Sequence, residues 1–328
     1  MAGRSSALGS ELALILIVAI WGWAFVWVKD AIGVLPELTF NALRFSVAAL
    51  AFLPWLLVLR RMPASATASA EGRGVLGAGI LAGAILALGY ALQTLGLERT
   101  SAGRSGVITG ISVVLVPIMM ATLFSQRVRR AEWRGVGLAL LGLLLLGVGD
   151  QPLGLGDLLV LGCAVAFAAH VVALDRLAPG RSVIRLAAAQ VSTAAVLFIV
   201  AALLLDGDRG PTRDLGALPQ EVWGAIALTG LVGTTLAFAV QTRAQQCSTP
   251  TRIALILALE PVFALIAGRV EHGESPGGPA LFGCVLIVGG MLSAELGPQA
   301  RGGEAGADAD PASDVESVGP REGPGPEH

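Results

Sequence analysis

Long apolar runs alternate with short polar breaks ten times along the first 296 residues of the chain. An apolar run of about 20 residues matches the thickness of a bilayer's hydrocarbon core. Backbone groups inside lipid must be satisfied within their own segment, so such runs fold as helices. The pattern predicts an all-α polytopic membrane protein with ten transmembrane helices, near residues 11–28, 38–59, 74–95, 105–124, 135–149, 155–174, 184–205, 222–242, 253–270 and 278–296.

The composition agrees with a membrane protein and excludes several other classes. The chain is 54% hydrophobic and only 14% charged, whereas a soluble domain is usually about a quarter charged. A net charge of −2 gives no reason to expect nucleic acid as a partner. Cys163, Cys247 and Cys284 are too widely spaced for a metal knuckle or a disulfide framework. We therefore expect no metal and no cofactor.

Basic residues are unequally distributed between the two sides that ten spans would create. An even number of spans puts both termini on one side, and that side carries 15 arginines. The opposite side carries five arginines and Lys29, the sole lysine. The positive-inside rule then places the N- and C-termini in the cytoplasm. We expect an integral protein of the plasma or inner cell membrane.

The chain changes character after Leu296. Residues 297–328 contain seven acidic side chains, two arginines, five prolines and no aromatic residue. Such a composition cannot bury enough apolar surface to fold. We therefore predict a cytoplasmic N-terminus at 1–10, a membrane domain, and a disordered cytoplasmic tail at 297–328.

The membrane domain contains signs of an internal duplication. Three short segments of the first half are echoed in the second in the same order: Asn41–Arg44 by Ala187–Gln190, Ala91–Thr94 by Ala239–Thr242, and Val116–Ile118 by Glu260–Val262. Because five spans is an odd number, the second copy would enter the membrane from the opposite face. We predict two five-helix inverted repeats, at 11–149 and 150–296, a layout typical of secondary transporters that bind substrate near the midplane.

Several short motifs link the chain to a known family. They are Trp21-Gly22 followed by Lys29, Arg44, Thr100–Gly103 leading to Val113–Pro117, Gly156-Asp157, Leu259–Phe263, Gly273-Glu274, and the pair Gly283 and Gly290. With them the chain resembles the drug/metabolite transporter superfamily, in particular permeases built from two EamA domains. The resemblance covers about residues 10–296. One departure is Ser125–Val128, where many relatives carry Gly-Glu. The resemblance implies a ten-helix permease for small metabolites, working by uptake or export.

Ionisable side chains at membrane depth are the first candidates for function, because burying them is costly. Glu260 could contact a substrate amine or carry a coupling proton, or it could make a packing hydrogen bond. Arg44 could hold a substrate carboxylate or pair with Glu260, or its side chain could snorkel to the outer headgroups. His170 could shuttle protons near neutral pH or serve only in packing.

Neutral groups within the spans are further candidates. Gln93, Gln190 and Gln241 could line a cavity or bridge helices. Trp21 and Tyr90 could stack on a substrate. These five side chains complete the set of substrate-binding or coupling candidates.

Two prolines are predicted to break their helices at corresponding places, Pro117 in the fourth span and Pro261 in the ninth. A proline lacks the N–H that would bond the carbonyl one turn earlier. Such breaks expose backbone groups to a cavity in transporters, although prolines are also ordinary kinks in membrane helices.

These features predict a secondary-active transporter of a small polar or amphipathic metabolite, such as an amino acid or a related compound. It would work by alternating access, driven by a proton gradient or by substrate exchange. The expected partners are the small-molecule substrate, membrane lipids and protons, and a homodimer is an open alternative. The competing hypothesis is a membrane-embedded enzyme or a non-transporting sensor. The chain lacks a Gly-rich phosphate loop ending in Lys-Ser/Thr and a G-x-S-x-G elbow, so we expect no enzyme.

Overall fold

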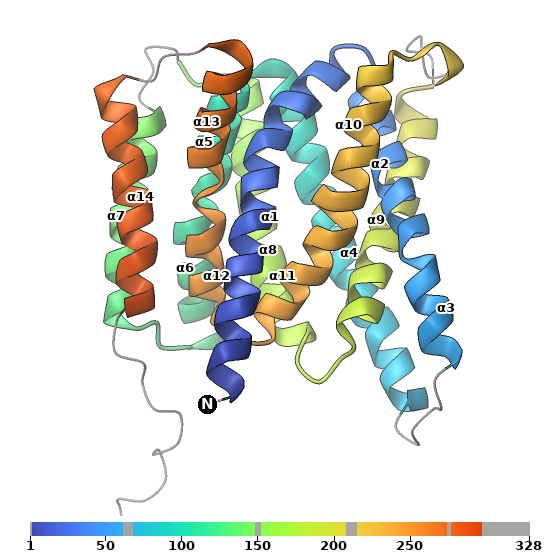
Figure 1. Ribbon diagram of the computed structural model, residues 1–328, viewed down its shortest axis with the longest axis horizontal. Helices are drawn as coiled ribbons and strands as arrows, with labels where there is room; N and C mark the ends of the chain where they lie inside the picture. Colours follow the sequence, from blue (N-terminus) through green and yellow to red (C-terminus); the bar gives the residue numbers. More distant parts are fainter. Residues whose placement is uncertain (1, 62–67, 148–151, 208–214, 274–276, 297–328) are drawn as a thin grey trace, which may run out of the picture. The chain divides into compact units, whose positions relative to one another are not determined.

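The computed structural model describes residues 2–61, 68–147, 152–207, 215–273 and 277–296, and the tail predicted at 297–328 lies outside them. Every regular element in these ranges is helical, and the long helices lie side by side as a bundle (Figure 1). The first half contains α1 (Ala2–Ile32), α2 (Glu37–Ala51), α3 (Leu53–Arg61), α4 (Ala68–Arg99), α5 (Ala102–Gly110), α6 (Ser112–Phe124) and α7 (Arg130–Gly147). The second half contains α8 (Leu155–Leu177), α9 (Val183–Leu205), η2 (Leu215–Ala217), α10 (Gln220–Gly230), η3 (Leu231–Leu236), α11 (Ala237–Gln245), α12 (Pro250–Leu257), α13 (Glu260–His272) and α14 (Gly278–Leu296).

The described helices confirm an all-α membrane protein. Eight stretches are long and apolar enough to span a bilayer, and a shorter apolar stretch covers Gly278–Ala294. The predicted fifth span, 135–149, falls largely on α7, whose 18 residues include the charged side chains Arg130, Glu132 and Arg134. The exact count of ten spans therefore stays a prediction.

Several spans are interrupted within the membrane. The ninth span is broken at Ala258 and Leu259, directly before Glu260 and Pro261, which begin α13. This is the expected place, because the proline ring crowds the carbonyl of Leu257 and offers it no N–H. The eighth span contains a π-helix, η3, between α10 and α11.

The fourth span corrects one expectation from the sequence. Its interruption lies at Ile111, and Pro117 sits inside the continuous helix α6. The N–H of Ile111 bonds the carbonyl of Ile108 at 3.1 Å, a tight turn that separates α5 from α6. Pro117 is therefore accommodated within its helix, as membrane helices allow, and the break lies before it.

Helices α7 and α14 pack with their backbones in contact, at one edge of the bundle in Figure 1. A Cβ atom on Gly135 would lie 2.6 Å from the carbonyl oxygen of Gly290. A Cβ atom on Gly142 would lie 2.5 Å from the carbonyl oxygen of Gly283. Small residues allow this close approach. In lipid, where no hydrophobic effect drives helices together, such close van der Waals packing stabilises their association.

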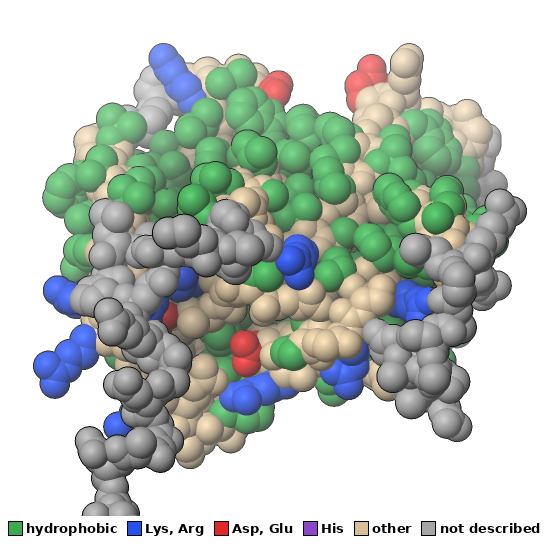
Figure 2. All heavy atoms as spheres, turned by 60° about the horizontal axis from the view of Figure 1, so that its bottom comes forward, with side chains coloured by type: hydrophobic (Ala, Val, Ile, Leu, Met, Phe, Trp, Pro, Cys, Tyr) green, Lys and Arg blue, Asp and Glu red, His purple; other side chains and the backbone are tan. Residues whose placement is uncertain are grey.

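The surface separates by chemistry. Large apolar side chains are exposed on the sides of the bundle, for example Leu203 at 74% and Leu204 at 76%. Lys and Arg side chains gather over the end of the bundle where α1 begins, which faces the viewer in Figure 2. A broad apolar side suits contact with lipid chains, since soluble monomers rarely expose such patches.

Candidate functional site

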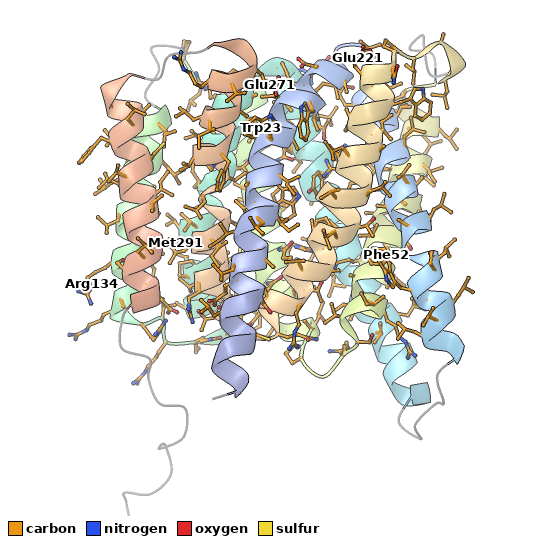
Figure 3. All side chains as sticks on the ribbon, in the orientation of Figure 1. Trp23, Phe52, Arg134, Glu221, Glu271 and Met291 are labelled. Atoms are coloured by element: carbon orange, nitrogen blue, oxygen red, sulfur yellow. The ribbon has the colours of Figure 1, made fainter. Side chains whose placement is uncertain are left out.

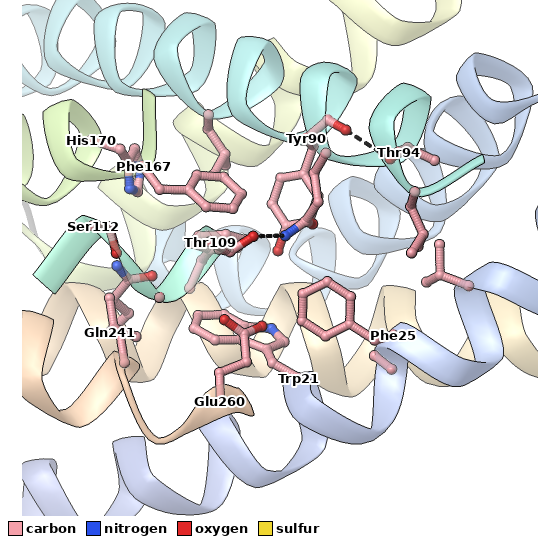
Figure 4. Close-up of a pocket in the computed structure, with 18 of the residues that line it drawn as sticks. Trp21, Phe25, Tyr90, Thr94, Thr109, Ser112, Phe167, His170, Gln241 and Glu260 are labelled. Atoms are coloured by element: carbon pink, nitrogen blue, oxygen red, sulfur yellow. Dashed lines mark hydrogen bonds between the residues drawn. The ribbon is translucent and has the colours of Figure 1, made fainter. Parts of the chain in front are cut away.

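A cavity lies in the middle of the bundle, between α1, α2, α4, the halves of the fourth and ninth spans, α8 and α11. The space free of atoms in and around it, open solvent included, is about 790 Å³. Most of the candidate residues from the sequence line it: Trp21, Arg44, Tyr90, Gln93, His170, Gln241 and Glu260. The fold thus brings seven side chains from distant parts of the chain to one place (Figure 4).

Aromatic rings form much of the cavity wall. Tyr90 packs edge-on against Phe167, with ring centroids 5.2 Å apart. Phe238 lies 5.8 Å from Trp21 and 6.3 Å from Tyr90 by the same measure. Phe25 faces the same space (Figure 4). These surfaces can stack on a flat or apolar part of a ligand.

Arg44 is buried and is held by the π-helix rather than by Glu260. Its Nε donates to Thr234 Oγ1 at 2.9 Å, and its Nη2 lies 3.4 Å from the carbonyl oxygen of Gly233. The guanidinium also lies 4.7 Å from the centroid of the Tyr90 ring, a cation–π distance. The snorkelling alternative is therefore wrong, because Arg44 is only 4% exposed. Within the described part of the chain, its Nη1 makes no hydrogen bond.

Sequence reasoning missed two residues that position Arg44, Gly233 and Thr234. Gly233 accepts a hydrogen bond from Trp21 Nε1 at 2.7 Å, besides its contact with Arg44. Thr234 donates its hydroxyl to the carbonyl of Thr229 at 2.8 Å while accepting from Arg44. Single-turn π-helices often mark functional sites because they leave backbone groups without their usual partners. The run of threonines in an apolar span was the available sequence signal.

Glu260 sits at the N-terminus of a half-helix in the middle of the membrane domain. It is half-buried and lines the cavity, and Figure 4 shows its carboxylate directed into that space. Among the described residues, no side chain or backbone group bonds or pairs with this carboxylate. The alternative in which Arg44 pairs with Glu260 is therefore not seen in the structure. The positive end of the α13 dipole favours an anion at this position.

The breaks of the fourth and ninth spans border the same cavity. Thr109, Gly110 and Ser112 flank the first break, and Leu257 and Glu260 flank the second. A Cβ atom on Gly110 would lie 3.3 Å from the ring of Pro261, so the two breaks are neighbours. Backbone that is not helical is tolerated at membrane depth where it lines a cavity.

A chain of polar side chains runs from the cavity wall into the helix packing behind it. His170 Nε2 and Gln190 Oε1 are 2.9 Å apart, and Gln190 Nε2 donates to Thr242 Oγ1 at 3.2 Å. Gln190 is fully buried and does not line the cavity, so its structural role is to bridge α8, α9 and α11. Gln241 does line the cavity, and its Oε1 has no hydrogen-bond partner in the described residues. That oxygen is itself buried, so a ligand donor could reach it only if the Gln241 side chain turned further into the cavity.

Comparison with known proteins assigns the chain to a family. The EamA-like transporter family model matches it twice, over residues 8–148 and 154–294. The chain belongs to the EamA-like transporter family. This confirms its resemblance to the drug/metabolite transporter superfamily.

Other members of the EamA-like family are similar along most of their length. An uncharacterised transporter of Archaeoglobus fulgidus is 28% identical, over 88% of this chain and 86% of its own. A probable amino-acid metabolite efflux pump of Salmonella typhimurium is 24% identical, over 84% and 91% of the two chains. One solved crystal structure shares the fold, with a TM-score of 0.68 and 22% identity, covering 89% of this chain and 97% of the other. The EamA-like protein described here is thus an integral membrane transporter.

The packing of α1 against the Glu260 break gives a testable prediction. A Cβ atom on Gly22 would lie 2.5 Å from Phe263 Cβ and 2.7 Å from the carbonyl oxygen of Glu260. Since neither atom can yield easily, we expect Gly22→Ala to destabilise the protein by about 1–3 kcal/mol, as overpacking does. Thermal unfolding in detergent measures the effect.

A matched control lies on the same helix. A Cβ atom on Gly9 would meet no atom within 4 Å, so Gly9→Ala should be neutral or stabilise by up to about 1 kcal/mol. Equal unfolding midpoints for the two variants would contradict the close approach of α1 and α13.

Proposed function

We propose that this protein is a secondary-active permease that carries a small amphipathic metabolite, an amino acid or a related compound, through the central cavity by alternating access. The observation that carries the proposal is the chemistry of the cavity. It combines an unpaired carboxylate at Glu260 with a cation at Arg44 whose Nη1 is unused in the described residues, beside aromatic walls.

Such a cavity is complementary to a zwitterion with an apolar part. The amine of the substrate would bond to Glu260, and its carboxylate would bond to Arg44 Nη1. The rings of Trp21, Tyr90 and Phe238 would cover the apolar part. The name of the Salmonella relative, a probable amino-acid metabolite efflux pump, supports the same class of substrate.

Alternating access would follow from a duplicated architecture. We infer ten spans in two inverted repeats, 11–149 and 150–296. The two matches of the family model support this, as does the equal spacing of Gly135 and Gly142 in α7 and of Gly283 and Gly290 in α14. Two pseudo-symmetric halves can exchange conformations, so the cavity opens first to one side and then to the other.

Coupling would depend on the same carboxylate. If Glu260 exchanges a substrate amine for a proton, a proton gradient drives transport. If it releases one substrate only for another, the protein is an exchanger. Both cycles require that Glu260 does not cross the membrane as a bare carboxylate without a bound substrate or proton. The cost of a buried, unpaired charge would enforce this.

Reconstitution into proteoliposomes tests the proposal. A thermal-shift screen of purified protein against amino acids and related amines identifies ligands, since a ligand stabilises only the state that binds it. Stabilising compounds are then tested for counterflow of radiolabelled substrate. The proposal fails if no zwitterion or amine stabilises the protein while compounds of another class both bind and move.

The orientation proposed from the arginine distribution also has a direct test. In a protein lacking its three native cysteines, Arg130→Cys should react with an impermeant maleimide only after the cells are permeabilised. Val34→Cys serves as the matched control, since Val34 is 43% exposed in the α1–α2 connection at the other end of the bundle. It should react in intact cells. The reverse pattern would place the termini outside.

A further inference from the structure

Two ion pairs at opposite ends of the bundle share one architecture. At the end where α1 begins, Glu11 pairs with Arg252, with Oε2 and Nη2 3.2 Å apart, and accepts a hydrogen bond from Ser248 Oγ at 2.6 Å. At the other end, Asp157 pairs with Arg104, with Oδ1 and Nε 2.8 Å apart, and accepts from Thr100 Oγ1 at 2.9 Å.

The two clusters also match in sequence. Thr100, Ser101 and Arg104 have the same spacing as Ser248, Thr249 and Arg252. The second residue of each set caps the helix that follows it. Ser101 Oγ accepts from the N–H of Arg104 at 3.2 Å, and Thr249 Oγ1 accepts from that of Arg252 at 3.3 Å. Each carboxylate lies near the beginning of the first span of a predicted repeat, on α1 or α8.

Each cluster holds one end of a short half-helix, and the other end of that half-helix borders the cavity. Arg104 belongs to α5, which leads from Ala102 to the break at Ile111. Arg252 belongs to α12, which leads from Pro250 to the break before Glu260. These half-helices have nine and eight residues, or about 14 and 12 Å of rigid helix at 1.5 Å per residue. A shift at one end therefore reaches the cavity wall.

The carboxylates are well buried for charged groups near the ends of a membrane protein. The side chain of Glu11 is 5% exposed and that of Asp157 is 7% exposed. A second hydrogen bond holds the segment before each half-helix. Before α5, Lys29 Nζ donates to the carbonyl of Thr100 at 3.0 Å, and before α12, Thr249 Oγ1 donates to Glu132 Oε1 at 2.8 Å. Hydrogen bonds to charged, buried groups are among the stronger ones in proteins.

We infer that these clusters are two matched latches, one at each end of the cavity, and that transport requires them to open in alternation. The inner latch is Glu11, Ser248 and Arg252, and the outer latch is Asp157, Thr100 and Arg104. Both are closed in this structure. The inference rests on the proposed alternating-access function, and it assigns the residues that hold each side shut.

Access to a cavity cysteine from each side tests the latches without a substrate. The reporter is Ser112→Cys, which lines the cavity, in a protein lacking native cysteines. Labelling by an impermeant methanethiosulfonate is measured in right-side-out and inside-out vesicles. Glu11→Gln should raise labelling from the side of the N-terminus roughly tenfold, and Asp157→Asn should raise it from the opposite side by a similar factor. Each substitution removes the negative charge of an ion pair and one of the two acceptor oxygens.

If a carboxylate variant fails to fold, variants that remove a single hydrogen bond still test the inference. Ser248→Ala and Thr100→Ala each remove one hydrogen bond from the inner and outer latch, and should shift labelling in the same two directions by a smaller factor. Asp175→Asn is the matched control, because Asp175 pairs with its neighbour Arg176 on α8 and, among the described residues, bonds to no other helix. It should leave both rates unchanged.

Opposite shifts in the two latches establish the inference. Shifts toward the same side, or no shift in folded variants, overturn it. These outcomes are independent of the proposed substrate. If the wild-type protein moves no amino acid while the latch variants show opposite shifts, the substrate class is contradicted and the latches are kept.

Discussion

Glu260→Gln should lower substrate flux roughly 30-fold while the amount of folded protein in the membrane is unchanged. The substitution keeps the size of the side chain and removes the charge that would meet a substrate amine or carry a proton. A hydrogen bond to a charged group contributes about 2 kcal/mol, and about 1.4 kcal/mol corresponds to a tenfold change. Counterflow in proteoliposomes, measured as a function of pH, detects the loss.

The structure supplies a matched control for this variant on the same half-helix. Glu271 lies near the far end of α13, where its Oε1 accepts a hydrogen bond from Trp23 Nε1 at 2.9 Å, and Figure 3 labels both residues. Glu271 does not line the cavity. Glu271→Gln should leave flux within about twofold of wild type, since exposed polar contacts contribute little. Normal transport with a normal pH profile in Glu260→Gln would show that the carboxylate does no more than line the wall.

Arg44→Lys should lower the flux of an anionic or zwitterionic substrate roughly 30- to 150-fold although the charge is retained. A lysine cannot donate to Thr234, approach Tyr90 face-on and still offer a further donor to the cavity, because its ammonium is a single point on a flexible stem. Loss of the Nε bond to Thr234 and of the stacking contact should cost about 2–3 kcal/mol. Flux and thermal unfolding are measured on the same preparation.

Arg176→Lys provides the comparison. The Arg176 guanidinium lies 4.3 Å from the centroid of the Phe124 ring, much as Arg44 lies 4.7 Å from that of Tyr90, but Arg176 is outside the cavity. This variant should transport normally. If Arg44→Lys transports at the wild-type rate, the guanidinium neither orders the π-helix nor meets the substrate, and the proposed zwitterion site is wrong.

Much of the fold follows from the sequence alone. Lengths of apolar sequence predict membrane helices because the bilayer sets a minimum span and leaves no alternative partner for the backbone. The same reasoning places Glu260, Arg44 and His170 at membrane depth, and Pro261 explains the break before α13. The motifs also lead to the family that the comparisons confirm.

Other features depend on how the helices are turned toward one another. The helices of a membrane bundle are apolar on nearly every face, so hydropathy fixes their depth but not their rotation. Gln93 and Gln241 line the cavity whereas Gln190 bridges helices, although all three look alike in sequence. Pro117 shows the same limit, since its helix stays continuous and the break lies at Ile111.

The pairings that define the site are the least accessible to sequence reasoning. Arg44 binds Thr234 instead of Glu260, and Glu11 meets Arg252, each across most of the chain. A side chain's charge and depth are properties of its own segment, and the sequence determined both. Which partner it meets depends on close approaches such as that of Gly22 to Phe263. Those approaches exist only once all the helices have packed, so only the tertiary structure decided them.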